Sequence, residues 1–303
     1  MKIAITGATG LVGAGLVRCL TRQGHEIHPL VRRSPQAAAH EIFWDPQKDE
    51  IDHAALEGMD AVIHLAGENL TGYWNAAKKE RIMTSRSLGT RLISQALAVL
   101  HHKPGILVSA SAIGFYGDRG AESLDESSPH GEGFLADVCM EWETAADPAR
   151  EAGIRVLHSR FGIILDPGGG ALARLLPLLR LGLGGRLGSG RQYWSWITMQ
   201  DVHSALAFCL EHPDLEGAVN FTAPAPATNA EFTRSAAQFL HRPAFFAVPA
   251  FALRLVMGEM AQEMLLSSTR AEPKKLLASG FRFDHTDLRA AFAAVLGPNL
   301  PAR

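Results

Sequence analysis

The sequence contains little cysteine, and its cysteines are far apart. The chain of 303 residues has three, Cys19, Cys139 and Cys209, and none of them belongs to a Cys-x-x-Cys pair. A disulfide framework or a zinc site is recognised by closely spaced cysteines, so this pattern argues against both. We therefore expect no metal and a reducing compartment, and we place the protein in the cytoplasm.

Two other features are missing. No apolar run reaches the length that a membrane-spanning helix needs. Charges of the two signs nearly cancel, because 29 lysines and arginines face 31 aspartates and glutamates. We expect neither a membrane nor a nucleic acid as partner. The first strand begins at residue 2, so we expect no signal peptide.

The most informative stretch that is present is a glycine-rich turn. It follows a β-branched apolar run at residues 2–6 and precedes apolar residues at helical spacing. This order opens a dinucleotide-binding βαβ unit, in which Gly7 permits the turn, Gly10 admits a pyrophosphate and Gly13 lets helix and strand pack closely. The helix N-terminus offers free N–H groups to phosphates. The alternative is a tight turn without a ligand. The predicted cofactor-binding residues here are Gly7, Thr9, Gly10, Leu11, Val12 and Gly13.

Two arginines follow the second expected strand, residues 26–31. An NAD enzyme carries an acidic residue about 20 residues beyond the last glycine, where it binds the ribose 2′-hydroxyl. Arg32 and Arg33 stand there instead, and a guanidinium group pairs well with phosphate. We therefore predict NADP (NADPH) as cofactor, with Arg32 the first candidate for its 2′-phosphate and Arg33 the second. The alternative is a solvated basic turn.

Strand and helix patterns alternate over the first half of the chain. The expected strands are 2–6, 26–31, 43–45, 60–67, 104–111, 154–165, 193–198 and 218–222. The expected helices begin after the glycine turn and include 51–58, 75–100, 134–152, 171–181, 202–210, 229–240, 250–257 and 272–278. The alternation predicts an α/β fold, a Rossmann-type doubly wound parallel sheet with a smaller, mostly helical C-terminal substrate lobe. Residues 1–165, with about 196–222 returning to them, form the Rossmann domain; 166–195 and 223–303 form the lobe.

Further candidates lie where expected strands end. In an open parallel sheet, ligands bind at the carboxyl ends of the strands. Small residues at 65–67 let a cofactor lie against backbone, and Glu68 and Asn69 reach the same crevice. Arg86 points either to the cofactor phosphates or to solvent. The candidates at these positions are Leu65, Ala66, Gly67, Arg86 and Ser109 for the cofactor, and Glu68 and Asn69 for the substrate.

Several of these motifs resemble those of one family. The segments TGATGLVG at 6–13, LAG at 65–67, SAS at 109–111 followed by Tyr-Gly at 116–117, and RFG at 160–162 stand in the order seen in extended short-chain dehydrogenase/reductases. Three more segments, LAGENL at 65–70, GSGRQYWSWI at 188–197 and GEM at 258–260 with GFRF at 280–283, resemble an atypical branch. That branch comprises epimerase-family proteins of uncertain activity, once labelled cell-division inhibitors. The resemblance implies a Rossmann fold and adds Arg160, Phe161 and Gly162 to the expected cofactor site.

One departure from the family concerns proton transfer. Active members use a Tyr-x-x-x-Lys pair on the helix after the fifth strand, in which lysine lowers the tyrosine pKa. Alignment of that helix places Leu135 and Cys139 at the two positions, and residues 134–152 contain neither lysine nor tyrosine. Ser111 matches the family's serine, which hydrogen-bonds the reacting oxygen. Tyr116 is the nearest alternative acid, unless it is a packing residue, so the predicted catalytic residues are Ser111 and Tyr116.

These observations leave two classes of function open. The first is an NADP-dependent oxidoreductase or epimerase acting on an unknown small polar or nucleotide-sugar substrate. Its pocket would include Trp194 and Trp196, which either stack on a sugar or base or anchor the core. The second is a non-catalytic NADP-binding regulatory or scaffold protein. The long helices at 75–100 and 134–152 could pair two copies into a homodimer.

Overall fold

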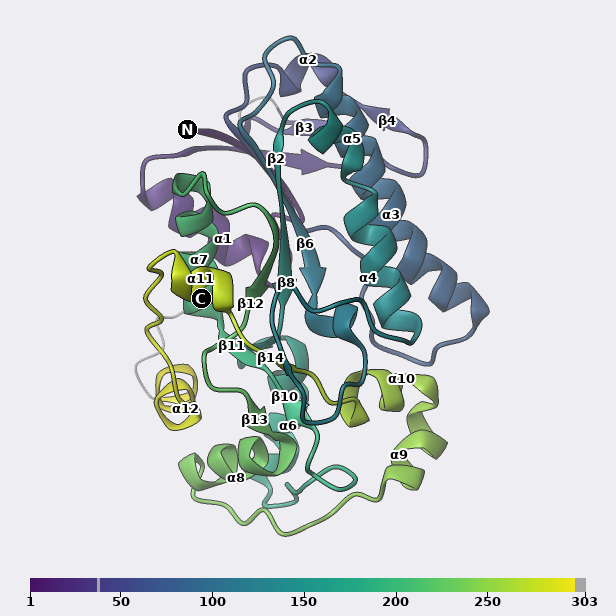
Figure 1. Ribbon diagram of the computed structural model, residues 1–303, viewed down its shortest axis with the longest axis vertical. Helices are drawn as coiled ribbons and strands as arrows, with labels where there is room; N and C mark the ends of the chain where they lie inside the picture. Colours follow the sequence, from purple (N-terminus) through teal and green to yellow (C-terminus); the bar gives the residue numbers. More distant parts are fainter. Residues whose placement is uncertain (37–38, 298–303) are drawn as a thin grey trace.

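The centre of the molecule is a large, mostly parallel sheet. The computed structural model describes residues 1–36 and 39–297. Over these residues one sheet has eight strands in the order β12-β8-β6-β5-β1-β2-β3-β4, and only β4 runs antiparallel to its neighbour (Figure 1). The fold class is therefore confirmed. The strands are β1 (Lys2–Thr6), β2 (Glu26–Val31), β3 (Ile42–Asp45), β4 (Glu50–Ile51), β5 (Ala61–His64), β6 (Ile106–Ala112), β8 (Arg155–Phe161) and β12 (Gly217–Phe221).

Helices cover both faces of this sheet because its strands are apolar on both sides. In β1, Ile3 and Ile5 belong to one core cluster and Ala4 to the other, since successive side chains of a strand point to opposite faces. The first face packs against α1 (Gly13–Arg22), α7 (Met199–Glu211) and α11 (Lys274–Ala278). On the opposite face lie α2 (His53–Leu56), α3 (Ala76–Ala98), α4 (Phe134–Thr144) and α5 (Asp147–Glu151) (Figure 1).

Three expected elements are each divided in the structure. The strand expected at 193–198 forms β10 (Tyr193–Trp194) and β11 (Trp196–Thr198). The helix expected at 134–152 is two helices, α4 and α5, because Pro148 in the first turn of α5 cannot donate the backbone hydrogen bond that a continuous helix needs. The strand expected at 154–165 ends as β8 at Phe161 and resumes as β9 (Ile163–Leu165). A Cβ atom at Gly162 would lie 2.6 Å from the carbonyl oxygen of Ser195, so glycine allows the chain to cross there.

Pro29 in β2 is tolerated for a local reason. A proline cannot donate to a neighbouring strand and is therefore expected at a sheet edge. β2 lies inside the sheet, but β3 pairs with it only at Leu30 and Val31. Pro29 pairs with Ile5 of β1 on its other side, and the edge toward β3 is still open at that point.

A smaller lobe, built mainly of helices, lies below the sheet in Figure 1. Its core joins buried side chains of α6, α8 and α12, including Leu176, Phe232 and Phe292. Short strands connect it to the rest of the chain. Its helices are α6 (Gly170–Arg180), α8 (Asn229–Phe239), α9 (Ala250–Met257), α10 (Glu259–Ala261), the π-helix η3 (Gln262–Leu266) and α12 (Leu288–Leu296). The short strands are β7 (Ser123–Leu124), β10 (Tyr193–Trp194), β11 (Trp196–Thr198), β13 (Ala227–Thr228) and β14 (Arg270–Ala271).

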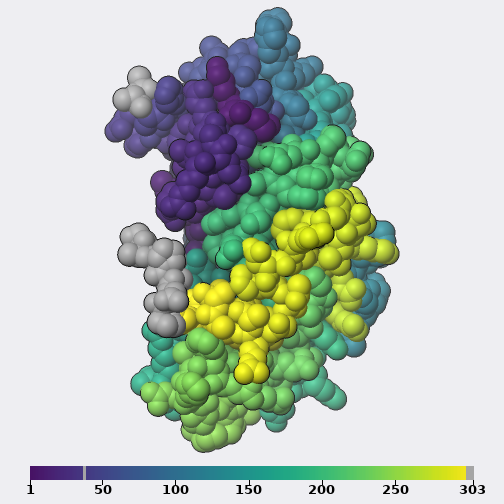
Figure 2. Space-filling view, turned by 90° about the vertical axis from the view of Figure 1, so that its left-hand side faces the viewer, coloured from purple at the N-terminus to yellow at the C-terminus, as the bar shows by residue number. Residues whose placement is uncertain are grey.

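The C-terminal stretch joins the sheet to the lobe. Leu276 and Phe281 pack in the core beside the sheet, whereas Leu288 and Phe292 pack in the core of the lobe. Figure 2 shows this stretch, in yellow, crossing one face of the molecule toward the lower lobe. Both cores thus use the same continuous segment. Among the described helices, none has the length and hydrophobicity to cross a membrane.

Candidate dinucleotide and substrate site

The glycine turn is folded so tightly that it admits no side chain at its third glycine. Gly7 has φ +66°, and its carbonyl oxygen accepts a hydrogen bond from the Gly10 N–H at 2.9 Å. A Cβ atom at Gly13 would lie 2.1 Å from that same oxygen. Among residues 1–36 and 39–297, no side chain caps the N-terminus of α1, and its first turn carries no acidic residue. The turn therefore offers backbone N–H groups and a positive helix end to an anion, as a pyrophosphate requires.

Thr6 joins this turn to the end of β5. Its hydroxyl oxygen accepts hydrogen bonds from the N–H groups of Leu65 and Ala66, at 3.0 and 3.1 Å. The hydroxyl proton is then free for Nδ1 of His64, 2.7 Å away. His64 is fully buried, and burial lowers its pKa to about 3, so the ring is the neutral acceptor that this bond needs. The two predicted cofactor-binding segments, 7–13 and 65–66, thus meet at the same edge of the sheet.

The two arginines after β2 have different surroundings. Both nitrogens at the end of Arg33 contact the Glu41 carboxylate, at 2.5 and 2.8 Å. Hydrogen bonds from Arg33 and from the N–H of Gln36 hold the Glu41 pKa below its ordinary value. Arg32 is exposed, and no ion pair to it is found within the described parts of the chain. Arg32 is consequently the arginine that is available to an incoming phosphate.

A buried ion pair lies beneath the ends of β6 and β8. Arg160 contacts both carboxylate oxygens of Glu143 at 2.8 Å, and the two side chains are only 5% and 13% exposed. Burial by itself would raise the Glu143 pKa, but the hydrogen bonds and charge of Arg160 outweigh it and hold that pKa below the ordinary value. The guanidinium carbon of Arg160 also lies 3.5 Å from the centre of the Phe115 ring.

This ion pair engages both predicted catalytic residues. The Ser111 hydroxyl donates to Glu143 at 2.7 Å, and Arg160 donates to the Tyr116 oxygen at 3.0 Å. The Tyr116 hydroxyl donates in turn to Asn220 at 2.8 Å. Tyr116 is completely buried, and burial raises its pKa to about 12. The structure corrects the prediction for Tyr116, because a buried phenol with these partners cannot reach a substrate in this conformation.

The two α4 residues that the resemblance aligns with a proton-transfer pair, Leu135 and Cys139, lie beside the turn after Ser111. A Cβ atom on Gly114, in the 3-10 helix η2 (Ile113–Tyr116), would lie 3.4 Å from Cβ of Leu135 and 3.8 Å from Sγ of Cys139. Both residues of α4 therefore face the turn that follows Ser111, as the sequence alignment expects. Burial raises the Cys139 pKa to about 12, so its thiol remains protonated. Neither side chain can transfer a proton at neutral pH.

Three predicted cofactor-binding residues make internal contacts instead. Arg86 is 8% exposed, donates to the carbonyl oxygens of Ile82 and Glu68, and lies over the Trp142 ring. Its hydrogen bond to the Glu68 carbonyl oxygen therefore helps to position the loop after β5. Ser109 is fully buried inside β6, and Arg160 belongs to the ion pair with Glu143. In this conformation none of the three reaches the crevice.

The loop after β5 carries its own charge pair. Glu68 contacts Nζ of Lys78 at 2.7 Å, and the hydrogen bond from Lys78 holds the Glu68 pKa below its ordinary value. The side-chain oxygen of the neighbouring Asn69 accepts from the N–H of Thr71. Glu68 and Asn69 remain partly or fully exposed at the crevice side of the loop, and their contact with a substrate stays a prediction.

The two tryptophans are core residues. Trp194 is 4% exposed and packs edge-to-face against Phe232, while Trp196 is completely buried and donates to the carbonyl oxygen of Ala225. The structure thus corrects their prediction as substrate-stacking residues and supports the alternative of core anchors. A tyrosine or tryptophan that is fully enclosed contributes packing area, not ligand contact.

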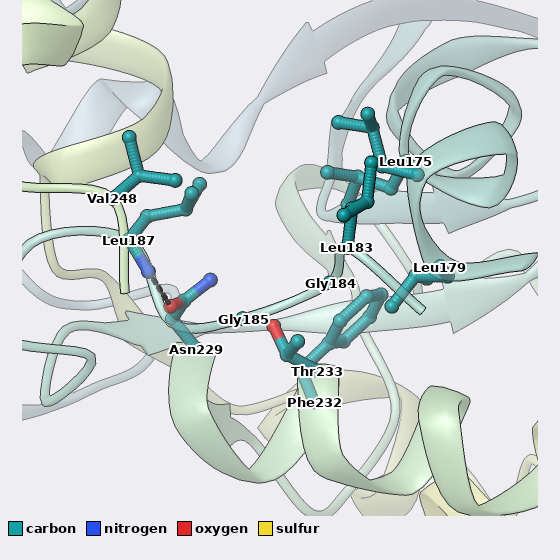
Figure 3. A pocket seen from close by; sticks show the side chains of 11 residues that line it. Leu175, Leu179, Leu183, Gly184, Gly185, Leu187, Asn229, Phe232, Thr233 and Val248 are labelled. Carbon is teal, nitrogen blue, oxygen red and sulfur yellow. Dashed lines mark hydrogen bonds between the residues drawn. The ribbon is translucent and has the colours of Figure 1, made fainter. Parts of the chain in front are cut away.

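A small cavity lies inside the lobe, away from the glycine turn. Leucines of α6 and of the following loop line it together with Phe232 and Thr233 (Figure 3). The Asn229 side-chain oxygen accepts from the Leu187 N–H at 2.8 Å, and the nitrogen of that amide has no protein partner within the described residues. The cavity measures about 40 Å³, which suits a water molecule beside this nitrogen but not a nucleotide.

Sequence patterns miss the acidic residues that hold the C-terminal segment against α3 and α4. Glu263 of η3 accepts from the N–H of Leu135 at the start of α4, and Glu259 contacts Lys79 of α3 at 2.9 Å. Both contacts join residues more than a hundred positions apart, so no local pattern indicates them. Glu143 carried one signal: it is an acidic residue on the otherwise apolar side of an expected helix, beside Trp142.

Comparisons with known proteins agree with this geometry. Residues 3–221 match the sequence model of the NAD dependent epimerase/dehydratase family, and residues 248–295 match a domain of unknown function (DUF1731). An epimerase family protein of Mycobacterium bovis, Mb2239, is 42% identical over 292 residues, covering 95% of each chain. The mouse epimerase family protein SDR39U1 is 36% identical, over 98% of this chain and 100% of its own. A crystal structure of human SDR39U1 with NADPH has a TM-score of 0.89, 32% identity and coverage of 99% of this chain and 100% of that one.

We expect Gly13→Ala to disrupt the turn. The new methyl group would overlap the Gly7 carbonyl oxygen, so helix α1 must move away from β1. The free energy of unfolding should fall by about 3 kcal/mol, as for overpacked sites at the upper end of their range. Denaturant unfolding measures this loss. Gly105→Ala is the matched control, because its methyl group would meet nothing closer than 3.7 Å. Equal stability of the two variants would contradict the close approach.

We expect Glu143→Gln to destabilise the protein by about 3 kcal/mol, because it leaves the buried Arg160 charge unpaired. The folded-state pKa of Glu143 is lowered, so its contribution is present above the ordinary carboxyl pKa and is lost as pH falls through the folded value. The stability difference between wild type and variant should therefore shrink in acid. Glu141→Gln, an exposed neighbour on α4, is the control. A difference that does not change with pH would refute the assignment.

Proposed function

The chain belongs to the NAD dependent epimerase/dehydratase family, and from this premise we propose that it is an NADPH-binding protein of the epimerase/oxidoreductase type. The observation that carries the choice of NADPH is the pair of positions after β2. Arg32 is exposed and unpaired among the described residues, and no acidic residue stands beside it to bind a ribose hydroxyl. The relative human SDR39U1, crystallised with NADPH, supports this choice.

The residues present fit such a cofactor. The backbone between Gly7 and Gly13 would hold the pyrophosphate, because the turn leads into the N-terminus of α1, where no side chain of the described residues caps the backbone N–H groups. The backbone of Leu65 and Ala66, fixed by Thr6, would lie along the adenosine side. Arg32 would bind the 2′-phosphate through its planar donor groups. Bound NADPH supplies a hydride, and this chain's residues supply the binding and orientation.

We propose a small polar or nucleotide-linked molecule as substrate. The smaller lobe, which contains α6, α8, α9 and α12, would bind it, because this lobe stands at the end of the sheet toward which β6 points (Figure 1). Glu68 and Asn69 are the proposed contacts on the side of the Rossmann domain. Proton transfer would not use Tyr116, since its hydroxyl is buried and bonded to Asn220. A homodimer through α3 and α4 stays a prediction.

The second candidate function is a non-catalytic NADPH-binding regulator or scaffold. One observation favours it: Leu135 and Cys139 occupy the positions from which the family transfers a proton, and Ser111 donates to Glu143. In that case the bound cofactor would stabilise the folded protein by mass action and would not turn over.

We expect wild-type protein to bind NADPH more tightly than NADH. The Arg32→Ala substitution should reduce this difference in affinity. Loss of a charge-assisted contact to phosphate is worth roughly 1.5–3 kcal/mol, so NADPH affinity should fall about tenfold or more while NADH affinity stays unchanged. Fluorescence titration measures both. Arg22→Ala, which removes another exposed arginine at the end of α1, is the control. Equal wild-type affinity for the two cofactors would rule out the role of Arg32.

We expect turnover of NADPH with at least one member of a panel of carbonyl compounds and nucleotide sugars, and we expect Tyr116→Phe to retain it. NADPH absorbance measures a reaction with net oxidation. Chromatographic separation of the products with mass spectrometry detects one without it, such as an epimerisation that leaves the mass unchanged. The variant should lose about 1–3 kcal/mol of stability, because Asn220 loses its donor. A folded Tyr116→Phe variant without activity would show that Tyr116 is catalytic. Absence of turnover throughout the panel would favour the regulatory function.

A further inference from the structure

We propose that Glu26, His28 and His40 form a binding site for one divalent transition-metal ion of the zinc type. One ligand atom of each side chain lies within 4.8 Å of the other two. The Glu26 oxygen Oε1 stands between the rings, 3.0 Å from Nε2 of His28 and 4.0 Å from Nδ1 of His40. Two neutral imidazoles and one carboxylate are a donor set that zinc accepts.

The register of the sheet explains why these residues meet. Glu26 and His28 lie on the same face of β2, because they are two positions apart in a strand. Leu30 of β2 pairs with Ile42 of β3, so two residues earlier His28 stands opposite His40. Regular pairing has not yet begun there, since Pro29 has no N–H to donate and His40 has φ +50°. The gap leaves room for side chains to converge at the edge of β2.

The geometry needs only a small adjustment to hold an ion. Ligand atoms about 2.0–2.1 Å from a tetrahedral zinc are roughly 3.4 Å apart. The Glu26–His28 distance is already shorter, and His40 must approach Glu26 by less than an ångström from 4.0 Å and also close its separation from His28, which is within 4.8 Å. The His40 side chain is 60% exposed and free to make this movement, whereas His28 is 12% exposed and held in the sheet. The exposed side leaves a fourth position for water.

The site also bears on the proposed cofactor. His40 precedes Glu41, whose carboxylate holds Arg33 and the N–H of Gln36. An ion bound by His40, Glu26 and His28 would hold His40 and the adjoining Glu41 against β2. Because Glu41 contacts Arg33, the ion would also steady the residues next to Arg32. Metal binding should therefore favour the conformation in which Arg32 is offered to a 2′-phosphate. This consequence rests on the proposed NADPH function, but the metal site itself does not.

The test of the site uses full-length protein without an affinity tag or nucleotide. Calorimetric titration with Zn²⁺ should give a stoichiometry of one ion per chain. Co²⁺ should give the visible absorption bands that are typical of a four-coordinate site. His40→Ala and Glu26→Gln should each weaken binding at least tenfold. His40 is exposed, so its variant should fold as the wild type does even if His28→Ala does not.

His102→Ala is the matched control, because His102 is an exposed histidine 3.4 Å from the carboxylate of Glu57 but belongs to no such cluster among the described residues. It should bind zinc as the wild type does. Failure of the wild type to bind zinc at micromolar concentrations, or equal weakening by His102→Ala and His40→Ala, would overturn the site.

A second titration tests the link to the cofactor. Saturating zinc should raise NADPH affinity several-fold in the wild type and leave it unchanged in His40→Ala, because the two bindings must be reciprocally coupled. Zinc binding without any change in NADPH affinity would retain the site and overturn the link. Zinc binding in a protein that binds no NADPH would leave the site standing and overturn the proposed function.

Discussion

The buried pair of Glu143 and Arg160 is the interaction on which the candidate site depends. It joins α4 to β8, and through Ser111 and Tyr116 it also fixes the end of β6 and the turn after it. Two charges in such an environment are tolerated only when their remaining donors and acceptors are satisfied. Both hydroxyl groups meet that need. The hydroxyl groups of Ser111 and Tyr116 are therefore needed to satisfy the buried ion pair, independently of any substrate.

This requirement separates cofactor binding from chemistry. The glycine turn and the backbone at 65–66, which the Thr6 hydroxyl holds in place, act through main-chain atoms, and they do not depend on the Glu143 pair. A proton-transfer group, by contrast, must have a pKa near neutrality and face the substrate. Burial raises the pKa of Tyr116 and that of Cys139 to about 12, far from neutrality. A cofactor site built on main-chain atoms therefore does not require a proton-transfer group beside it, and neither Tyr116 nor Cys139 has a pKa suited to that role.

The sequence predicts features that depend on local spacing and misses those that depend on distant partners. The glycine turn, the apolar strands and most helix positions follow from periodicity, and the structure agrees with them. Pro148 is itself a local signal for the break between α4 and α5. The burial of Trp194 and Trp196 and the pairing of Arg160 with Glu143 depend on side chains from other elements. Composition shows that such residues are polar or aromatic, but not whether another element covers them.

The edge between β2 and β3 is left open by Pro29, a residue that is unusual inside a sheet. Pro29 prevents regular pairing at that point, and the left-handed backbone of His40 keeps β3 from starting earlier. At this open edge, polar side chains of β2 and of the residues just before β3 converge at the surface. It lies on the same short segment as Arg32 and Arg33. A ligand bound at this edge would consequently act on the neighbouring arginines that we propose for the 2′-phosphate, without touching the glycine turn.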